Sequence, residues 1–322
     1  MTIDPEDYLE PRCPLEEPCG CNHEHAHGSG PGAEYTHGNG CDCCHDHEEN
    51  CCCDHDHDHG DDCCGHDHGA MPHRNQPRRI PVREVIEECD RLFNAEKMLE
   101  LGEHLRKWRD EARRIGDREA ELGILSELMG HYRMLDDRER GLMAVRDGFA
   151  LLGQVGIAGS VTAGTILING ATALQAFGDI DGALNYYKEA FRCYGAHLDP
   201  NDWRFAGLLN NMAAAYAAKH DVKYAEAYYR KALDVLKACG NLMDAAVTHV
   251  NLAQMYAAED RNDPRISVEL ELAVACFDDP AAVRDGYYAH TCRKCASAFG
   301  PLGYPEIEEE LNWRADEYYA GN

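Results

Sequence analysis

The chain has 322 residues and a formal net charge of −27, because 58 acidic residues face only 31 lysines and arginines. A nucleic-acid-binding surface needs clustered Lys and Arg, so nucleic acid is excluded as the expected partner. The first residues, MTIDPEDYLEP, hold neither a basic start nor an apolar run, which argues against a secretory signal and a membrane span. We therefore expect a cytoplasmic protein with no membrane partner.

The N-terminal segment has a composition of its own. Residues 1–73 hold eleven of the 17 cysteines, twelve of the 18 histidines, and eighteen acidic residues against a single arginine. From residue 13 to residue 73 there is almost no Leu, Ile, Val or Phe, so too little apolar area is available to offset chain entropy. We predict that residues 1–81 form a disordered acidic tail followed by a linker, MPHRNQPRRIP, at 71–81.

The tail is rich in metal-ligating side chains. Thiolate sulfur and imidazole nitrogen are the donors that zinc prefers, and they also suit nickel and copper. In a reducing compartment dense Cys and His indicate metal ligands rather than disulfides. Adjacent cysteines such as Cys43 and Cys44 give no fixed finger framework, so we expect several zinc or nickel ions in exchanging ligand sets. The composition resembles the His-rich and Cys-rich extensions of bacterial nickel and zinc handling proteins. The alternative is a solvating acidic segment with incidental histidines. The predicted ligands are Cys19, Cys21, His23, His25, His27, Cys41, Cys43, Cys44, His45, His47, Cys51, Cys52, Cys53, His55, His57, His59, Cys63, Cys64, His66 and His68.

Helical periodicity begins after the linker. Val85, Ile86, Cys89 and Leu92 fall on one stripe from about Val82, and a second amphipathic run extends from Ala95 to Ile115. We interpret residues 82–116 as an N-terminal repeat or capping hairpin, since they do not match the repeat that follows cleanly.

A helix pair then recurs along the chain. Its first helix carries a large, a small and a large residue at spacing i, i+4, i+7, and its second helix carries a similar triplet after a tight turn. The two clearest copies of the first triplet are 42 residues apart, at Leu167, Ala171, Leu174 and at Leu209, Ala213, Tyr216. A weaker copy precedes them at Leu125, Met129 and Tyr132. Another follows at Leu252, Ala253 and Tyr256, where His249 replaces an apolar residue and about three inserted residues place the second-helix triplet at Val268, Leu272 and Ala275.

This skeleton resembles the tetratricopeptide repeat, in the longer form found in kinesin light chains. The resemblance implies an all-α, right-handed solenoid of antiparallel helix pairs. Its inner surface, lined by the first helix of each pair, would bind extended peptides. We expect repeats at about 117–157, 158–200, 201–241 and 242–278, and a C-terminal cap at 279–322, within a solenoid spanning 82–322.

One position in the repeat predicts a partner-binding site. Glu127, Asn169, Asn211 and Asn251 are equivalent, and in peptide-binding members of this repeat class that position faces the groove. Asn offers both a donor and an acceptor to a peptide backbone. In the alternative interpretation, each Asn satisfies a neighbouring helix backbone inside the stack. Two further residues lie near the same face, Arg133 and Gln254. Because we find only Arg133 as a cation on these helices, recognition of an acidic C-terminus is not favoured.

The C-terminal stretch predicts a helix from Pro280 after an aspartate cap, and a last helix over 306–319. Its RDGYYAHTCRKCASAFGPLGY string resembles the end of a group of bacterial tetratricopeptide proteins, common in Firmicutes and related lineages, which implies a fold and no established activity. Cys292 and Cys295 form an isolated CxxC. One interpretation is two small apolar side chains packed in the cap. The other is a metal half-site completed by His290 or by a tail ligand.

No catalytic motif is present: there is no Gly-rich phosphate loop, no GxSxG elbow and no HExxH. We predict a protein that is not an enzyme, but a protein-interaction scaffold whose tail binds transition metal for buffering or delivery. The alternative is a plain adaptor whose tail is a passive metal sink or a solvating segment. A third hypothesis makes the tail a ligand of its own groove.

Overall fold

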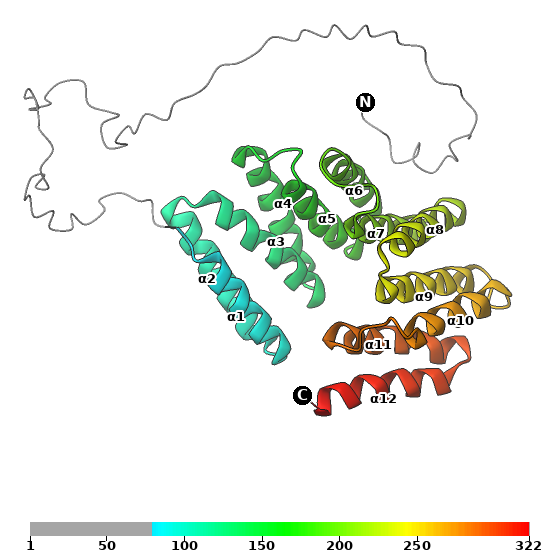
Figure 1. The fold of residues 1–322 in the computed structure, drawn as a ribbon. Helices are drawn as coiled ribbons and strands as arrows, with labels where there is room; N and C mark the ends of the chain where they lie inside the picture. The colour runs from blue at the N-terminus through cyan, green and yellow to red at the C-terminus, as the bar shows by residue number, and fades with distance from the viewer. Residues whose placement is uncertain (1–78, 322) are drawn as a thin grey trace, which may run out of the picture. The chain divides into compact units, whose positions relative to one another are not determined.

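The structure is a computed structural model that describes residues 79–321. Within these residues it contains α-helices, one short 3-10 turn at Gly300–Leu302 and no strand, which confirms the all-α prediction (Figure 1). None of the helices in this range is long and apolar enough to cross a membrane. The helices are α1 (Val82–Asn94), α2 (Met98–Ile115), α3 (Arg118–Met134), α4 (Arg138–Val155), α5 (Val161–Ala176), α6 (Ile180–Gly195), α7 (Trp203–Ala218), α8 (Val222–Cys239), α9 (Leu242–Glu259), α10 (Arg265–Asp278), α11 (Gly286–Phe299) and α12 (Pro305–Gly321).

Consecutive helices pack as pairs, and the pairs stack on one another. The first helix of each pair contacts its own second helix, and from α3 onward it also contacts the first helix of a neighbouring pair, as in α3 against α5 and α9 against α11. In Figure 1, α4, α6, α8 and α10 lie on the outer side of the curve, and α3, α5, α7 and α9 lie on the inner side. This repeat arrangement is a tetratricopeptide-like solenoid.

The predicted skeleton forms the core of the stack. Ala171, Ala213 and Ala253 are fully buried, so the small position of the triplet lies where helices approach most closely. The large positions on either side, such as Leu167 and Tyr256, are also buried. The alternation of small and large residues therefore sets the spacing between helices.

The same triplet is present in the first pair, which the sequence left open between a repeat and a capping hairpin, and in the last pair, which was predicted to be a cap. On α1 it is Val85, Cys89 and Leu92, shifted by 40 residues from the α3 copy; on α11 it is Cys292, Ala296 and Phe299, shifted by 43 from the α9 copy. All six residues are buried. Residues 79–321 thus hold six copies of the pair, and cysteine serves as a small or apolar residue in two of them.

The predicted register of α10 is wrong. Val268 and Leu272 are 52% and 42% exposed, and Ala275 is also exposed. The buried triplet at spacing i, i+4, i+7 is instead Ile266, Leu270 and Ala273. The spacing from the α9 triplet to the α10 triplet is therefore one residue longer than the corresponding spacing in the α5/α6 and α7/α8 pairs, rather than about three residues longer.

Two predicted helix starts also differ from the structure. The run placed at Ala95 begins at Met98, because Glu96 has a φ of 56° and breaks the helix. The helix placed at Pro280 begins at Gly286, where the Asp285 side chain accepts a hydrogen bond from the Tyr288 backbone N–H. A capping aspartate suits a helix start because its carboxylate satisfies an otherwise unpaired N–H. Here Asp285, and not the aspartate before Pro280, takes that role.

Candidate partner-binding surface

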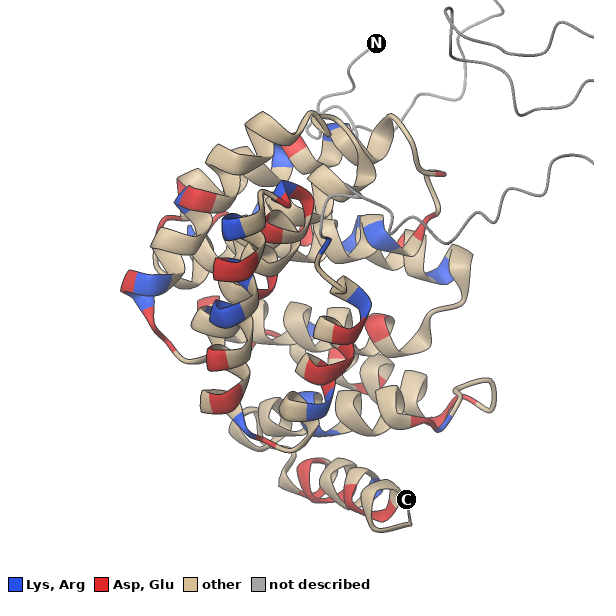
Figure 2. Cartoon of the chain, turned by 90° about the vertical axis from the view of Figure 1, so that its left-hand side faces the viewer, with Lys and Arg blue, Asp and Glu red and all other residues tan. Residues whose placement is uncertain are grey.

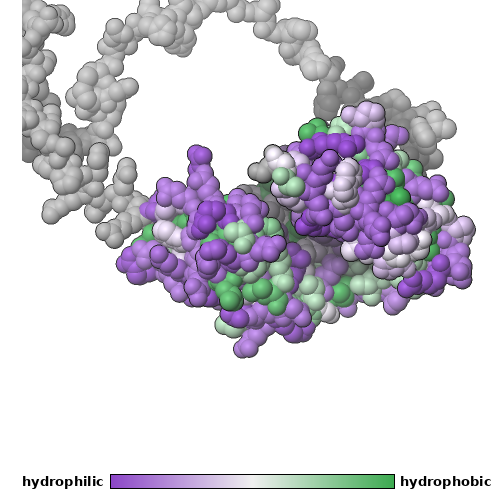
Figure 3. Space-filling model, turned by 90° about the horizontal axis from the view of Figure 1, so that it is seen from below, coloured by the Kyte–Doolittle hydropathy of each residue, from purple (hydrophilic) through white to green (hydrophobic). Residues whose placement is uncertain are grey.

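The predicted groove residues lie on the inner helices. Glu127 on α3 is exposed, and Asn169, Asn211 and Asn251 on α5, α7 and α9 are half-buried. Each stands two residues after a triplet residue that faces the core, so the four occupy one equivalent face of successive helices. Seen from below in Figure 3, the molecule is hollowed between two raised parts. We call these four positions the amide row, after its three asparagines.

The asparagines of the amide row differ in their contacts. The Asn169 Nδ2 donates a hydrogen bond to Ser126 Oγ on α3 at 2.9 Å. This side chain therefore already links two inner helices, as the alternative interpretation expected, although its partner is a side-chain hydroxyl. The Asn211 and Asn251 amides make no hydrogen bond to another residue of the described range. Their donors and acceptors are therefore available to a ligand.

A neighbouring asparagine makes the equivalent interhelix bond one repeat later. The Asn210 Nδ2 donates to Thr248 Oγ1 on α9 at 2.8 Å, and Thr248 in turn donates to the Asp244 carbonyl. The sequence interpretation did not single out Asn210, since nothing distinguishes it from Asn211 by residue type. Asn210 and Asn211 lie on different faces of α7. This difference alone makes the Asn210 amide a link between helices and leaves the Asn211 amide open to a partner.

The middle of this surface is almost free of charge. Helix α5 contains no charged residue, and the only one in α7, Arg204, forms an ion pair with Asp202 at 2.7 Å. Small residues such as Gly207 and Ala214 flank Asn211 on its helix face. A polypeptide backbone can approach such a surface closely and without the cost of desolvating charges.

Charged residues stand at the α3 end of the surface. Burial raises the pKa of Glu127 even though part of its side chain reaches solvent, and the nearby Asp90 carboxylate raises it further. Arg133 is exposed at the end of α3. Elsewhere, acidic and basic residues are interspersed along the helices (Figure 2), and many of them pair with each other, as Arg113 does with Glu121 at 2.7 Å.

A buried charge network lies behind the amide row, between α8, α9 and α10. The Glu269 carboxylate is 2% exposed and accepts hydrogen bonds from Arg230 at 2.6 Å and from His249 at 2.7 Å. Arg265 stacks over the Tyr256 ring at 3.9 Å and pairs with Glu226 at 3.1 Å. The network supplies ion pairs that hold three helices together, and it accounts for the histidine in the triplet position of α9.

A cavity of about 450 Å³ opens between α9 and α11. It includes Gln254, which the sequence placed near the groove, and Ser297, the equivalent residue one repeat later. Arg261 borders the cavity and donates to the Pro301 carbonyl at 2.9 Å. The other lining residues are Ala257, Ala258, Ala298, Pro301 and Leu302.

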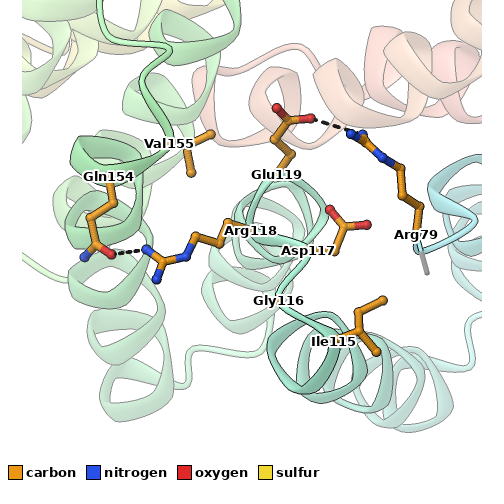
Figure 4. Close-up of a pocket in the computed structure, with 8 residues that line it drawn as sticks. All are labelled: Arg79, Ile115, Gly116, Asp117, Arg118, Glu119, Gln154 and Val155. Carbon is orange, nitrogen blue, oxygen red and sulfur yellow. Dashed lines mark hydrogen bonds and ion pairs between the residues drawn. The ribbon is translucent and has the colours of Figure 1, made fainter. Parts of the chain in front are cut away.

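A second cavity, of about 330 Å³, lies where the chain enters the solenoid (Figure 4). Asp117 begins α3 there, and its carboxylate accepts a hydrogen bond from the Ile80 backbone N–H at 2.9 Å. Arg79 pairs with Glu119 at 3.6 Å, and Arg118 donates to Gln154 at 2.5 Å. These contacts fix the start of the helical region and leave few polar groups for a ligand.

Cys292 and Cys295 are both buried in the core of the last pair. Burial raises the pKa of both thiols, that of Cys295 to about 12, so each is protonated at neutral pH. Within residues 79–321 no three His, Cys, Asp or Glu residues are grouped to hold a metal ion, and the exposed His290 does not complete the pair. The predicted tail ligands, Cys19 to His68, lie outside the described residues.

Comparison with known proteins agrees with this geometry. Residues 164–203 match the family model of the tetratricopeptide repeat. That span covers most of α5, all of α6 and the first residue of α7. A search of curated proteins found no match.

Two solved structures are similar to this chain. One is BtubC (BKLC) from P. vanneervenii, with 17% identity, a TM-score of 0.45, and coverage of 76% of this chain and 92% of that one. The other is a Podosopora anserina protein with nearly identical TPR-like repeats, described as a kinesin light chain. It has 15% identity, a TM-score of 0.43, and coverage of 62% of this chain and 95% of that one.

Proposed function

We propose that the chain is a protein-interaction scaffold that binds an extended segment of a partner protein along the inner face of α3, α5, α7 and α9. The observation that carries the proposal is the pair of open amides at Asn211 and Asn251 on a surface that is otherwise small and neutral. An amide that can donate and accept at once suits the peptide backbone, whatever the partner's side chains are.

The test is a peptide library screened against the full chain. Peptides selected by the wild type should bind the double variant Asn211→Ala, Asn251→Ala about tenfold or more weakly, since each lost neutral hydrogen bond costs about 1 kcal/mol. Asn169 is left intact, because its loss would also break the link to Ser126. The matched control is Asn185→Ala, at an exposed position on the outer helix α6. Unchanged affinity in the double variant would remove the amide row from the binding site.

We propose also that the N-terminal tail binds several zinc or nickel ions, as a buffer or for delivery. The support is compositional: twenty-three Cys and His side chains in residues 1–73, with aspartates between successive histidines to add oxygen donors and attract cations. Tetrahedral sites would take on the order of five ions. The alternative is a scaffold whose tail is a passive metal sink or a solvating segment.

Elemental analysis decides between metal binding and solvation. The full chain, purified anaerobically without a histidine tag, should carry several ions, and a chain starting at Met71 should carry few or none, with both retaining helical circular dichroism. Absence of metal from the full chain, even after titration with zinc and nickel, would leave only the solvating segment. Delivery and a passive sink are then separated by measuring whether bound metal changes affinity for the selected peptides.

A further inference from the structure

The amide row extends beyond the four repeats in which the sequence placed it. Because α1 and α11 carry the same buried triplet, the equivalent positions there are Glu87 and Lys294. Read from α1 to α11, the row is Glu87, Glu127, Asn169, Asn211, Asn251 and Lys294. One position of the repeat thus changes from carboxylate through amide to ammonium along the stack.

The acidic end holds two carboxylates without an ion-pair partner in the described region. Asp90 on α1 and Glu127 on α3 are both exposed and lie close enough for Asp90 to raise the pKa of Glu127. Neither carboxylate forms an ion pair within the described range, whereas Glu87 is paired with Arg83 at 2.8 Å. Two unpaired carboxylates held near each other in a hollow surface favour a cationic partner.

The opposite end has the reverse charge. Lys294 is exposed and forms no ion pair within residues 79–321. Arg261, at the rim of the α9/α11 cavity, bonds only to a backbone carbonyl, so its charge is also not balanced by a carboxylate of the described region. Their neighbour Arg293 is different, because it pairs with Asp316 on α12. Lys294 and Arg261 are therefore two cations without a carboxylate partner in the described region, and Arg261 lies at the rim of the cavity.

The distance between the two ends suits a peptide. Four steps between adjacent inner helices separate α3 from α11, and packed helices lie about 8–10 Å apart, which gives a path of roughly 40 Å. An extended polypeptide covers this path with about 12 residues. Helix α5, which has no charged residue, and α7, whose only charged residue is the ion-paired Arg204, occupy the middle of the path.

We propose that the inner face selects a polypeptide segment with a charge pattern: a cationic end at Asp90 and Glu127, a neutral middle over α5 and α7, and an anionic end at Lys294 and Arg261. This inference rests on the proposed scaffold function and adds the chemistry and the orientation of the partner. The occupant is a segment of another protein, bound in one direction along the stack.

The experiment uses the full chain and synthetic peptides of about fifteen residues, long enough for the path. One peptide carries lysines at one end, a neutral middle and glutamates at the other end, a second is its sequence reversal, and a third has the same composition with the charges interleaved. The first two peptides, in which the charges are grouped at the ends, are called the block peptides. The better binder of these two should bind at least about tenfold more tightly than the interleaved peptide. A photoreactive group at its cationic end should cross-link to residues 82–134, and one at its anionic end to residues 242–299.

Variants test the end of the surface that holds Lys294 and Arg261. Lys294→Glu with Arg261→Glu should remove the preference for the block peptide. Lys237→Glu with Arg192→Glu, at exposed positions on the outer helices α8 and α6, changes the net charge equally and should preserve that preference. Equal binding of all three peptides, or cross-links from both peptide ends to both regions, would overturn the charge pattern and leave the scaffold in place. A photoreactive group at residue 297 that captures residues 1–73 of the same chain would overturn it in favour of an intramolecular occupant. If library-selected peptides also fail to respond to the Asn211 and Asn251 changes, it is the proposed function that fails.

Discussion

His249 Nδ1 lies 2.7 Å from Glu269 Oε2, and this contact joins α9 to α10 inside the stack. In the other repeats the position of His249 holds a residue such as Leu167 or Leu209, which packs by apolar contact alone. The polar substitution is matched twenty residues later by a buried carboxylate, which also accepts a hydrogen bond from Arg230 on α8. Three helices are therefore joined by one acidic side chain.

Removing that side chain should destabilise the protein. In Glu269→Ala, Arg230 and His249 lose their shared acceptor, and we expect a loss of about 2 kcal/mol in the free energy of unfolding. The loss is smaller than for a fully buried pair because the Arg230 side chain is 42% exposed and can turn to water. Denaturant unfolding measures the effect, with the exposed Glu271→Ala on the same helix as control. A loss no larger than that of the control would show that the network contributes nothing to stability.

The same carboxylate predicts a pH dependence. Burial alone would raise the pKa of Glu269, but hydrogen bonds from His249 and Arg230 outweigh burial and hold its pKa below the ordinary value. A carboxyl group with a lowered pKa stabilises the folded state above its unfolded pKa of about 4.3, and this contribution is lost as the pH falls further. The stability difference between the wild type and Glu269→Gln should therefore be constant from neutral pH down to about pH 5 and shrink below it. A constant difference down to pH 3 would contradict this assignment.

The ionised carboxylate of Glu127 should destabilise the folded state, which is the opposite of the effect of Glu269. Its pKa is raised by burial and by Asp90, so the protonated form favours the folded state at low pH and the charged form is penalised at neutral pH. Glu127→Gln should thus unfold at a higher denaturant concentration than the wild type at pH 7, and the two midpoints should converge below about pH 4.5. The control is Glu139→Gln, at an exposed position on α4. A lower midpoint for Glu127→Gln at pH 7 would mean that the carboxylate has a stabilising partner.

Two leucines on α10 give a direct test of the corrected register. Leu270 is 1% exposed and Leu272 is 42% exposed, although they are only two residues apart. Leu270→Ala should lower the free energy of unfolding by about 3 kcal/mol, because packing is lost and a cavity is left. Leu272→Ala should have a free energy of unfolding within about 0.5 kcal/mol of the wild-type value. The reverse order in thermal or denaturant unfolding would restore the register that the sequence suggested.

Two helical glycines, Gly170 and Gly207, allow the effect of steric crowding on stability to be measured separately from the effect of helix propensity. A Cβ on Gly170 would lie 2.3 Å from the Phe149 ring, which itself packs against Tyr186, so Gly170→Ala should destabilise by about 2 kcal/mol. Nothing lies within 4 Å of the corresponding atom at Gly207, and Gly207→Ala should stabilise by up to about 1 kcal/mol. Equal effects of the two changes would show that the ring moves aside freely.

The sequence predicted the fold where residue type and spacing agreed. Leu167, Ala171 and Leu174 recur 42 residues later almost unchanged, and both triplets are buried as expected. The α11 copy was missed, and the α1 copy was left open between a repeat and a hairpin, because cysteine replaces the small residue on α1 and a large one on α11. The α10 register failed because Val268 and Leu272 also have helical spacing, and periodicity alone does not say which stripe faces the core.

The candidate site was predictable by position but not by contact. The repeat placed Asn169, Asn211 and Asn251 at one position, and all three lie on inner helices. The Ser126 hydroxyl that holds Asn169 depends on how α3 and α5 are set against each other, which no spacing within one helix reveals. Lys294 was not considered because its helix was taken for a cap, and so the cation at the end of the row was overlooked.

The stacking of pairs by neighbour contacts also has a mechanical consequence. Glu127 and Lys294 belong to helices that are linked through a series of interfaces between neighbouring pairs. A small tilt at each interface adds up over the whole series, while every local contact changes little. The stack can therefore bend elastically, and the distance between Glu127 and Lys294 can adjust to the length of the bound partner segment.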